Sequence, residues 1–312
     1  MKITVVGAGN VGATCAQYLA EKEISNEVVL LDIKQNLSEG KGLDMWQTSP
    51  INLFDTRVHG YTNDYSKTAG SEIVIITAGL PRKPGMSRDD LISTNAEIVR
   101  TVTENVVKYS PKTIIIVVSN PLDVMTYCAY LTSKFDSKRV FGMAGILDTA
   151  RYAAFLAEAL NCSPKDIHSQ ILGGHGDTMV PLPRYTTVSG IPVTELIDTE
   201  RLNAIITRTT KGGGEILNLL GTTAWYAPGA GAVQMAEAIV KDQKRIFQCC
   251  TWLQGEYGLK DVYMGVPVKL GKNGIEQIIE LKLNDGEKAL VHKSALAVKE
   301  VMDVLDKMMG KK

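Results

Sequence analysis

The sequence has no excess of charge of either sign. Its 312 residues include 34 Lys and Arg and 34 Asp and Glu, which gives a formal net charge of zero. Such a balance provides no broad field to attract nucleic acid or an anionic membrane, and we expect neither as a partner. Any cationic site must therefore be local.

Cysteine is scarce and long apolar runs are missing. The five cysteines form no CxxC pair and no metal-ligand spacing, so we expect no metal site and no disulfide scaffold, only reduced thiols in a cytoplasmic protein: Cys15, Cys128, Cys162, Cys249 and Cys250. The apolar runs fall well short of the ~20 residues of a membrane-spanning helix. A strand expected from about Ile3 leaves no room for a signal peptide.

Strands and helices alternate in the first half of the chain. Expected strands lie at residues 2–6, 28–31, 72–77 and 113–118, with helices at residues 13–22 and 90–109. This βαβ series predicts an α/β fold with a doubly wound, mostly parallel Rossmann sheet.

The pattern changes near residues 140–148, where a glycine-containing turn leads into a helix expected from about Asp148. We expect two domains there, residues 1–145 and a second α/β or α+β domain at residues 146–312. No Pro/Ser-rich linker separates them, which predicts a shared, extensive interface.

A GxGxxG motif follows the first expected strand and opens the first expected helix. Its residues are Gly7, Ala8, Gly9, Asn10, Val11 and Gly12. In a dinucleotide-binding site the first glycine permits a tight turn, the second lets the pyrophosphate approach and the third packs the helix against the strand. The helix N-terminus then offers N–H groups to the phosphates.

Asp32 lies twenty residues beyond Gly12, at the end of the second expected strand. A carboxylate there accepts hydrogen bonds from the ribose hydroxyls and repels a 2′-phosphate, so we expect NAD rather than NADP as the cofactor. The alternative is an ordinary glycine turn beside a surface aspartate.

The second half contains the segment Gly173-Gly174-His175-Gly176-Asp177. Flanking glycines let another molecule approach His175, whose imidazole can give and take a proton near neutral pH. Asp148 and Arg151 lie three residues apart on one expected helix, so Asp148 can orient His175 while Arg151 binds a substrate carboxylate. Taken alone, this Asp–Arg pair is more typical of a surface salt bridge.

These motifs together carry a family resemblance. The segments GAGNVG, LPRKPGMSRDDL, VSNPLDV, ILDTARY and GGHGD occur in the order typical of the lactate and malate dehydrogenase family. The chain resembles this family along its whole length, and within it the lactate-dehydrogenase-like malate dehydrogenases of prokaryotes. The resemblance implies an NAD-dependent dehydrogenase with a small-molecule substrate, in a homodimer or homotetramer.

The resemblance also assigns the cations of residues 80–91. Arg88 matches the loop arginine that polarises the substrate carbonyl. Arg82 stands where lactate dehydrogenases usually have glutamine, and an arginine suits the second carboxylate of malate or oxaloacetate. The implied reaction transfers a hydride between malate and NAD while His175, oriented by Asp148, exchanges the proton.

Other positions follow from the same resemblance. It implies substrate contacts for Asn120 and Thr223 and cofactor contacts for Asn95, Val118, Ser119 and Asn120. Asn95 could instead be a polar residue on a surface helix, and Thr222 leaves the register of Thr223 open by one residue. Gly212-Gly213-Gly214 follows no strand, so we expect a kinked helix packed near the site rather than a second phosphate loop.

Three other functions remain open at this point. A lactate dehydrogenase is disfavoured by Arg82. An NAD-binding or redox-sensing module would leave Arg82, Arg88, Arg151 and His175 without a purpose. An NAD-dependent glycosidase that uses a metal is disfavoured because no Cys/His ligand set occurs in the sequence.

Overall fold

The apolar runs of the first half fold into the strands of a doubly wound sheet. The computed structural model describes residues 1–81 and 88–310, and it leaves the side chain of Arg88 undescribed. The strands are β1 (Lys2–Val6), β2 (Glu27–Asp32), β3 (Arg57–Thr62), β4 (Ile73–Ile76), β5 (Ile114–Val117), β6 (Val140–Gly142), β7 (Ile167–His168), β8 (Ile171–Leu172), β9 (Val180–Pro181), β10 (Thr187–Val188), β11 (Ile191–Pro192), β12 (Arg245–Gln254), β13 (Lys260–Gly271) and β14 (Gly274–Ile278).

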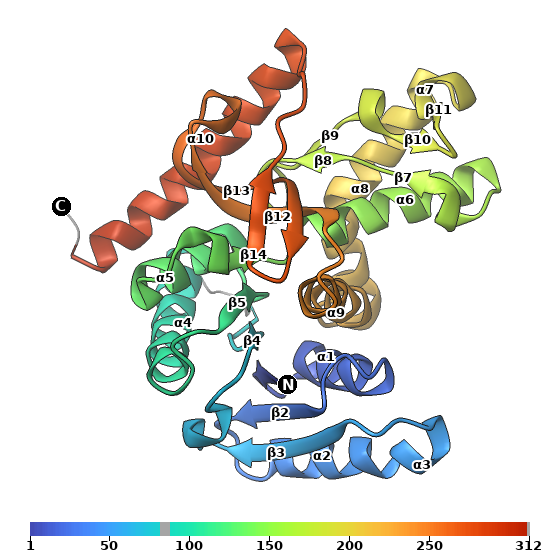
Figure 1. Cartoon of the computed structure of the whole chain (residues 1–312). Helices are drawn as coiled ribbons and strands as arrows, with labels where there is room; N and C mark the ends of the chain where they lie inside the picture. The colour runs from blue at the N-terminus through green and yellow to red at the C-terminus, as the bar shows by residue number, and fades with distance from the viewer. Residues whose placement is uncertain (82–87, 311–312) are drawn as a thin grey trace.

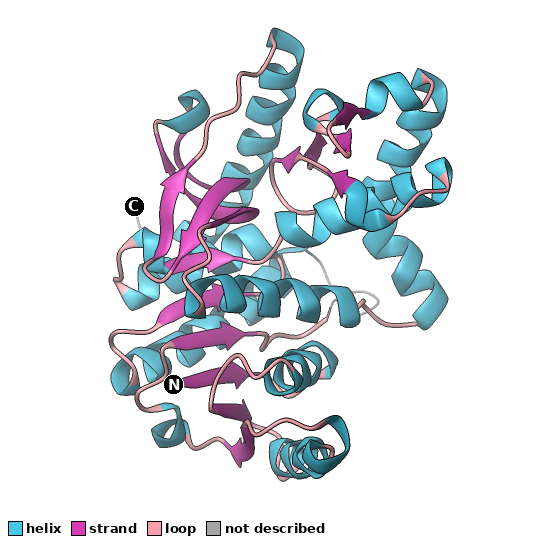
Figure 2. Cartoon of the chain, turned by 45° about the vertical axis from the view of Figure 1, so that its right-hand side comes forward, coloured by secondary structure: helices cyan, strands magenta, loops and turns pink. Residues whose placement is uncertain are grey.

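Helices cover both faces of this sheet, as Figure 2 shows. They are α1 (Asn10–Glu21), α2 (Leu37–Gln47), α3 (Ser49–Asn52), α4 (Arg88–Tyr109), α5 (Leu122–Ser133), α6 (Gly145–Leu160), α7 (Val193–Leu196), α8 (Thr199–Leu220), α9 (Tyr226–Val240) and α10 (Asp285–Met308). Helix α1 begins three residues before the expected start, because Asn10 and Val11 already belong to its first turn. Among the helices in the described ranges, none has the length and apolar composition needed to cross a membrane.

The strand order places the glycine motif at the middle of the parallel part of the sheet, where β1 lies beside β4. Within the described residues, the largest sheet has the order β14-β13-β12-β6-β5-β4-β1-β2-β3, and its strands from β6 to β3 are parallel (Figure 1). The order reverses between β1 and β4, and ligands of such sheets bind beyond the carboxyl ends of the strands at that point. Gly7 follows β1 there, and Asn120 lies beyond the end of β5.

The second half of the chain extends this sheet. The antiparallel strands β12, β13 and β14 join it where Cys250 pairs with Gly142 of β6. One buried apolar cluster includes residues of both halves, among them Ile75, Phe141 and Val266. A smaller cluster around Tyr152 and Leu156 holds α6 against the short strands near α8. The expected interface between the halves is therefore continuous β-structure and shared core, which fixes the side chains of one half relative to the other.

Candidate active site

Each glycine of the first motif has its own geometric requirement. Gly7 has a φ of +104°, which a side chain rarely permits. A Cβ on Gly12 would lie 1.8 Å from the Gly7 carbonyl oxygen, so α1 packs directly on the turn. A Cβ on Gly9 would meet nothing within 4 Å. The turn therefore leaves open space at Gly9, where a phosphate group would approach.

The N-terminus of α1 supplies donors to that space. Gly9 is its N-cap residue, and no described side chain caps the helix, so its first N–H groups point outward unpaired. By contrast, α10 has a complete capping box formed by Asn284 and Glu287. An uncapped N-terminus after a glycine turn is the arrangement that binds phosphates.

Two charged side chains hold the peptide groups of Ala8. Asp32 accepts a hydrogen bond from the Ala8 N–H at 2.6 Å, and Lys41 of α2 donates to the Ala8 carbonyl oxygen at 2.8 Å. The second oxygen of Asp32 accepts the Lys34 N–H at 2.9 Å. A carboxylate has about four acceptor positions, so Asp32 can still accept ribose hydroxyls. Lys41 was missed by the sequence analysis, because a lone lysine on a polar helix carries no motif.

His175 and Asp148 form a close pair across the second half. Nδ1 of His175 lies 2.9 Å from Oδ2 of Asp148, which sits in the first turn of α6 with its side chain 3% exposed. The carboxylate thereby favours the tautomer with a proton on Nδ1, which leaves Nε2 free to exchange a proton with a ligand. The predicted pairing of these two residues, separated by 27 positions, is present.

The surroundings of His175 favour its protonated form. Burial alone lowers the pKa of the imidazole, but attraction by Asp148 and by the more distant Asp123 outweighs burial, and the pKa is raised above its ordinary value. A raised pKa increases the protonated fraction of His175 at any given pH. It can then act as a proton donor in one direction and, once deprotonated, as a base in the other.

Arg151 is a half-buried cation rather than part of a surface salt bridge. Its Nη1 lies 3.4 Å from Oδ1 of Asp148, and the two side chains are only 13% and 3% exposed. Burial lowers the pKa of Arg151, an effect that Asp148 partly offsets. Within the described residues its buried Nε–H has no hydrogen-bond partner. A half-buried guanidinium with unused donors is suited to a planar, bidentate carboxylate.

The glycines beside His175 serve packing more than ligand approach. A Cβ on Gly174 would lie 2.6 Å from a methyl group of Val298 in α10, and one on Gly173 would lie 2.7 Å from Ser294 Oγ. Gly173 and Gly176 also have φ values near +100°. The sequence predicts that these glycines give another molecule access to His175, but of the three only Gly176 has open space beside it.

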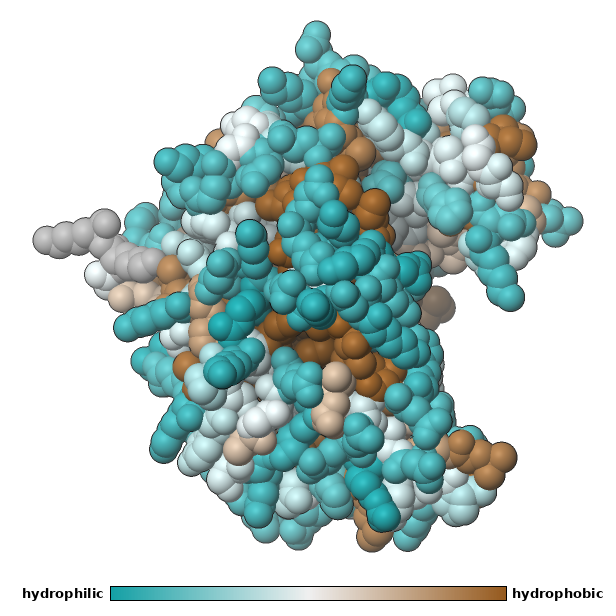
Figure 3. Space-filling view, in the orientation of Figure 1, coloured by the Kyte–Doolittle hydropathy of each residue, from teal (hydrophilic) through white to brown (hydrophobic). Residues whose placement is uncertain are grey.

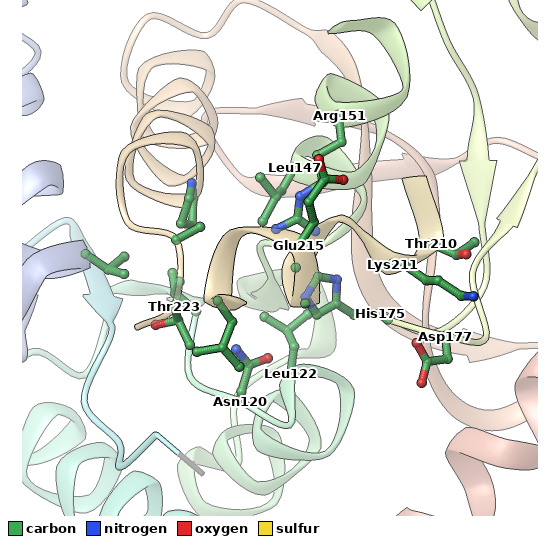
Figure 4. A pocket seen from close by; sticks show the side chains of 18 of the residues that line it. Asn120, Leu122, Leu147, Arg151, His175, Asp177, Thr210, Lys211, Glu215 and Thr223 are labelled. Carbon is green, nitrogen blue, oxygen red and sulfur yellow. The ribbon is translucent and has the colours of Figure 1, made fainter. Parts of the chain in front are cut away.

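A cavity of about 780 Å³ brings the two halves of the site together (Figure 4). In Figure 4 Arg151 and His175 lie on one side of the hollow, with Asn120 and Thr223 across from them. Its wall contains residues expected at the site and residues of α8: Val11, Val118, Asn120, Leu122, Met143, Leu147, Arg151, His175, Gly176, Asp177, Thr210, Lys211, Gly213, Gly214, Glu215, Leu217, Asn218, Thr223, Ala224 and Pro228. Thr223, rather than Thr222, belongs to this lining.

Helix α8 passes close to Arg151 because of its glycines. It is one continuous helix from Thr199 to Leu220. A Cβ on Gly212 would lie 3.2 Å from Cδ of Arg151, and one on Gly213 would lie 3.8 Å from a guanidinium nitrogen. The close packing expected of this glycine run is therefore present, and it closes one side of the Arg151 pocket.

Asn95 and Ser119 make hydrogen bonds to the backbone segments that follow β4 and β5. Asn95 is buried, and its amide accepts the Leu80 N–H at 2.8 Å and donates to the carbonyl oxygens of Leu80 and Asn120. The surface-helix alternative for Asn95 is therefore wrong. Ser119 donates its hydroxyl to the Ala78 carbonyl at 2.5 Å. These bonds fix the backbone that carries Asn120.

Two predicted arginines have no described side chain. Arg82 lies outside the described residues, and Arg88 begins α4 with an undescribed side chain. Asp123 was missed, although it stands within the VSNPLDV segment and its carboxylate accepts the His175 N–H at 2.9 Å. An acidic residue just after a proline at a helix start was its only sequence signal.

A Rossmann sheet facing a His–Asp pair and a buried arginine is typical of NAD-dependent dehydrogenases of small 2-hydroxy acids. Comparisons with known proteins agree. Residues 1–142 match the lactate/malate dehydrogenase NAD binding domain, and residues 146–308 match the lactate/malate dehydrogenase alpha/beta C-terminal domain. The chain belongs to the lactate/malate dehydrogenase family, and it is an NAD-dependent oxidoreductase.

Three relatives illustrate the similarity. A malate dehydrogenase of Cytophaga hutchinsonii is 69% identical over 306 residues, 98% of each chain. The malate dehydrogenase structure from Salinibacter ruber is 55% identical with a TM-score of 0.96 and covers 100% of this chain and 99% of its own. The lactate dehydrogenase of Cryptosporidium parvum, complexed with lactic acid and NAD, is 38% identical with a TM-score of 0.94 over 98% of each chain.

Proposed function

We propose that this chain catalyses the reversible oxidation of (S)-malate to oxaloacetate, with NAD as the hydride acceptor and His175–Asp148 as the proton relay. Its activity is that of a malate dehydrogenase. The residue roles rest on one observation. The buried carboxylate of Asp148 contacts both His175, at 2.9 Å, and Arg151, at 3.4 Å, and these two residues line the same cavity.

The glycine turn and Asp32 fit the cofactor. The open space at Gly9 and the uncapped first turn of α1 receive the pyrophosphate, and Asp32 accepts the ribose hydroxyls. Residues 7–12 together with Val118, Ser119 and Asn120 form the rest of this binding surface. Bound NAD supplies the carbon that accepts or returns the hydride. Asn95 supports the surface by holding Leu80 and Asn120, as its three hydrogen bonds within the protein indicate.

The substrate is held by cations and polar groups on several elements. Arg151 binds the C1 carboxylate, and its unused Nε–H and low exposure support this role. Asn120 and Thr223 contact the substrate from the opposite wall of the cavity. Arg82 binds the C4 carboxylate and Arg88 stabilises negative charge on the reacting oxygen, as the family resemblance implies.

The proton moves at Nε2 of His175. In malate oxidation the neutral imidazole takes the hydroxyl proton while Asp148 stabilises the imidazolium that forms. In oxaloacetate reduction the protonated imidazole returns that proton to the carbonyl oxygen. Helix α8 packs against the side chain of Arg151 at Gly212 and closes one side of its pocket.

Arg82 is the residue on which substrate preference depends. Enclosing pyruvate would leave its guanidinium unpaired, at a cost of about 3–5 kcal/mol, or roughly two to four decades of discrimination. The decisive experiment is NADH oxidation with oxaloacetate and with pyruvate, for the wild type and Arg82→Gln. We expect a large oxaloacetate preference that shrinks or inverts in the variant.

Lys83→Gln is the matched control, because it removes the same charge from the neighbouring position of the same segment. It should retain the oxaloacetate preference. A preference unchanged in Arg82→Gln would contradict the specificity assignment, and absence of NADH oxidation with both substrates would contradict the activity itself.

We further propose domains at residues 1–145 and 146–312, a homodimer or homotetramer, and a cytoplasmic location. The family-model matches end and begin at residues 142 and 146, close to this boundary. Exposed apolar side chains support self-association: Leu43, Ile51, Leu53, Leu219 and Tyr226. Figure 3 shows hydrophobic side chains projecting where α3 lies in Figure 1. The cytoplasmic location rests on the scarcity of cysteine in the sequence.

A further inference from the structure

Asp123 is a buried carboxyl group that touches the main chain of His175. It is the second residue of α5, its exposed fraction is 7%, and its Oδ2 accepts the His175 N–H at 2.9 Å. Its Oδ1 is buried and accepts no hydrogen bond from a conventional donor in the described chain. The Cys250 thiol, a weak donor, is a further polar neighbour of the carboxyl group.

A purely structural role does not explain this choice of side chain. An asparagine in the same place would offer an oxygen to the His175 N–H without burying an ionisable group. A buried carboxyl oxygen without a strong partner lowers the stability of the fold. An ionisable side chain that destabilises the fold, and that lies next to a reacting histidine, indicates that the charge of the side chain has a function.

The charges around His175 come from several elements. Asp148 and Arg151 face it from α6, Asp123 faces it from α5, Asp177 lies two residues along its own loop, and Lys211 and Glu215 of α8 line the same cavity. The pKa of Asp123 is raised, mainly by burial and also by the nearby charge of Asp148, and the opposing pull of the His175 N–H and imidazole only partly offsets the rise. The N-terminus of α5 also favours a negative charge at its second residue. The Asp123 carboxyl and the imidazole therefore titrate as a coupled pair.

We propose that Asp123 is a positioning residue for the proton transfer: its carboxyl group holds the main chain of His175 while Asp148 holds the ring. Its negative charge adds to that of Asp148 beside the imidazole. This proposal rests on the proposed role of His175. Two carboxyl groups from different helices would then support one histidine. Asp123 of α5 acts on the position and charge of His175, and Asp148 of α6 acts on its tautomer.

The test separates the hydrogen bond from the charge. Asp123→Asn keeps an oxygen for the His175 N–H and removes the charge, whereas Asp123→Ala removes both. The His175 pKa is measured by NMR on histidine-labelled apo protein, with His175→Asn used to assign the signal, and kcat and KM are measured against pH. We expect Asp123→Asn to lower the His175 pKa by about 1. The acid limb of kcat/KM for malate oxidation then moves to lower pH.

Asp123→Ala should lower kcat about 10- to 100-fold, because a displaced imidazole loses its alignment, with little change in NADH affinity. Asp123→Asn should recover most of that loss at its own optimum pH. Asp177→Asn is the matched control, since it removes an exposed carboxylate two residues from His175, and it should shift the His175 pKa much less than Asp123→Asn.

An unchanged His175 pKa in Asp123→Asn would overturn the proposal, as would a shift no larger than that of Asp177→Asn. If Asp123→Ala fails to fold, the NMR titration of Asp123→Asn still decides the question. A His175→Asn variant with normal turnover would overturn the proton-transfer role itself, and that result is distinct because it does not involve Asp123.

Discussion

The cofactor side and the substrate side of this site are built in different ways. The cofactor side is formed by six consecutive residues, Gly7–Gly12, together with the end of the next strand at Asp32. The substrate side is formed by separate segments of the chain. Asn120, His175 and Thr223 line the cavity, and Asp148 lies behind His175. One is a local turn between a strand and a helix, and the other exists only in the folded chain.

The two sides also differ in which parts of the chain position them. The glycine turn is set by its own backbone, because a Cβ on Gly12 would overlap the Gly7 carbonyl. The position of His175 depends on α5, α6 and α10, which contact it or its flanking glycines through Asp123, Asp148 and Val298. Changes on the substrate side should therefore affect chemistry with cofactor binding retained, and changes in the turn should do the opposite.

The largest separation is expected for His175→Asn. Turnover in both directions should fall about 1,000-fold or more, because the proton donor and acceptor is lost. NADH affinity, measured by fluorescence titration, should stay within about twofold, since the cofactor contacts proposed for residues 7–12 and Asp32 do not involve the imidazole of His175. Weak NADH binding in the variant would show that the two sides are coupled more tightly than the geometry indicates.

Gly12→Ala should break the cofactor side. Its Cβ would lie 1.8 Å from a backbone oxygen, so α1 must shift, and overpacking of this kind costs about 1–3 kcal/mol of unfolding free energy. NADH binding should be lost with it. Gly9→Ala is the matched control, because its Cβ meets no protein atom within 4 Å. It should keep the wild-type unfolding free energy but weaken NADH binding. Equal destabilisation of the two variants, measured by urea unfolding, would contradict this distinction.

The smallest effect is expected for the glycines of α8. Gly212→Ala places a methyl group 3.2 Å from Arg151 and should raise the KM for malate a few-fold, because the guanidinium must move. Gly214→Ala meets no protein atom within 4 Å and should stabilise the helix by about 0.5–1 kcal/mol, whereas Gly212→Ala should gain less because of its contact with Arg151. An unchanged KM in the Gly212 variant would remove α8 from the account of the Arg151 pocket.

Much of the fold could be predicted from the sequence because its signals are local. The β-branched runs around Ile3 and Ile75, the glycine turn and the helix after it all depend on neighbours in the chain. Helix ends were less accurate, since α1 begins at Asn10 and α6 at Gly145, where glycine and polar residues give a weak start signal. The extension of the sheet by β12 could not be predicted, because strand pairing between distant segments leaves no local pattern.

The site was predicted in part for the same reason. The pairing of His175 with Asp148 followed from the motifs together with the family resemblance. The role of Asn95 in holding Leu80 and Asn120, and the contact of Asp123 with the His175 main chain, depend on distances across the fold. Neither residue type has a preferred spacing that would reveal such contacts.

The sequence by itself determined the α/β class, the cofactor turn and the family. It did so because turns, strand runs and helix starts are governed by backbone sterics and by near neighbours. Only the tertiary structure decided that Arg151 is half-buried with an unused donor, that α10 requires the glycines beside His175, and that a second carboxylate supports that histidine. Burial, desolvation and charge coupling depend on which distant segments pack together, and those quantities exist only once the chain is folded.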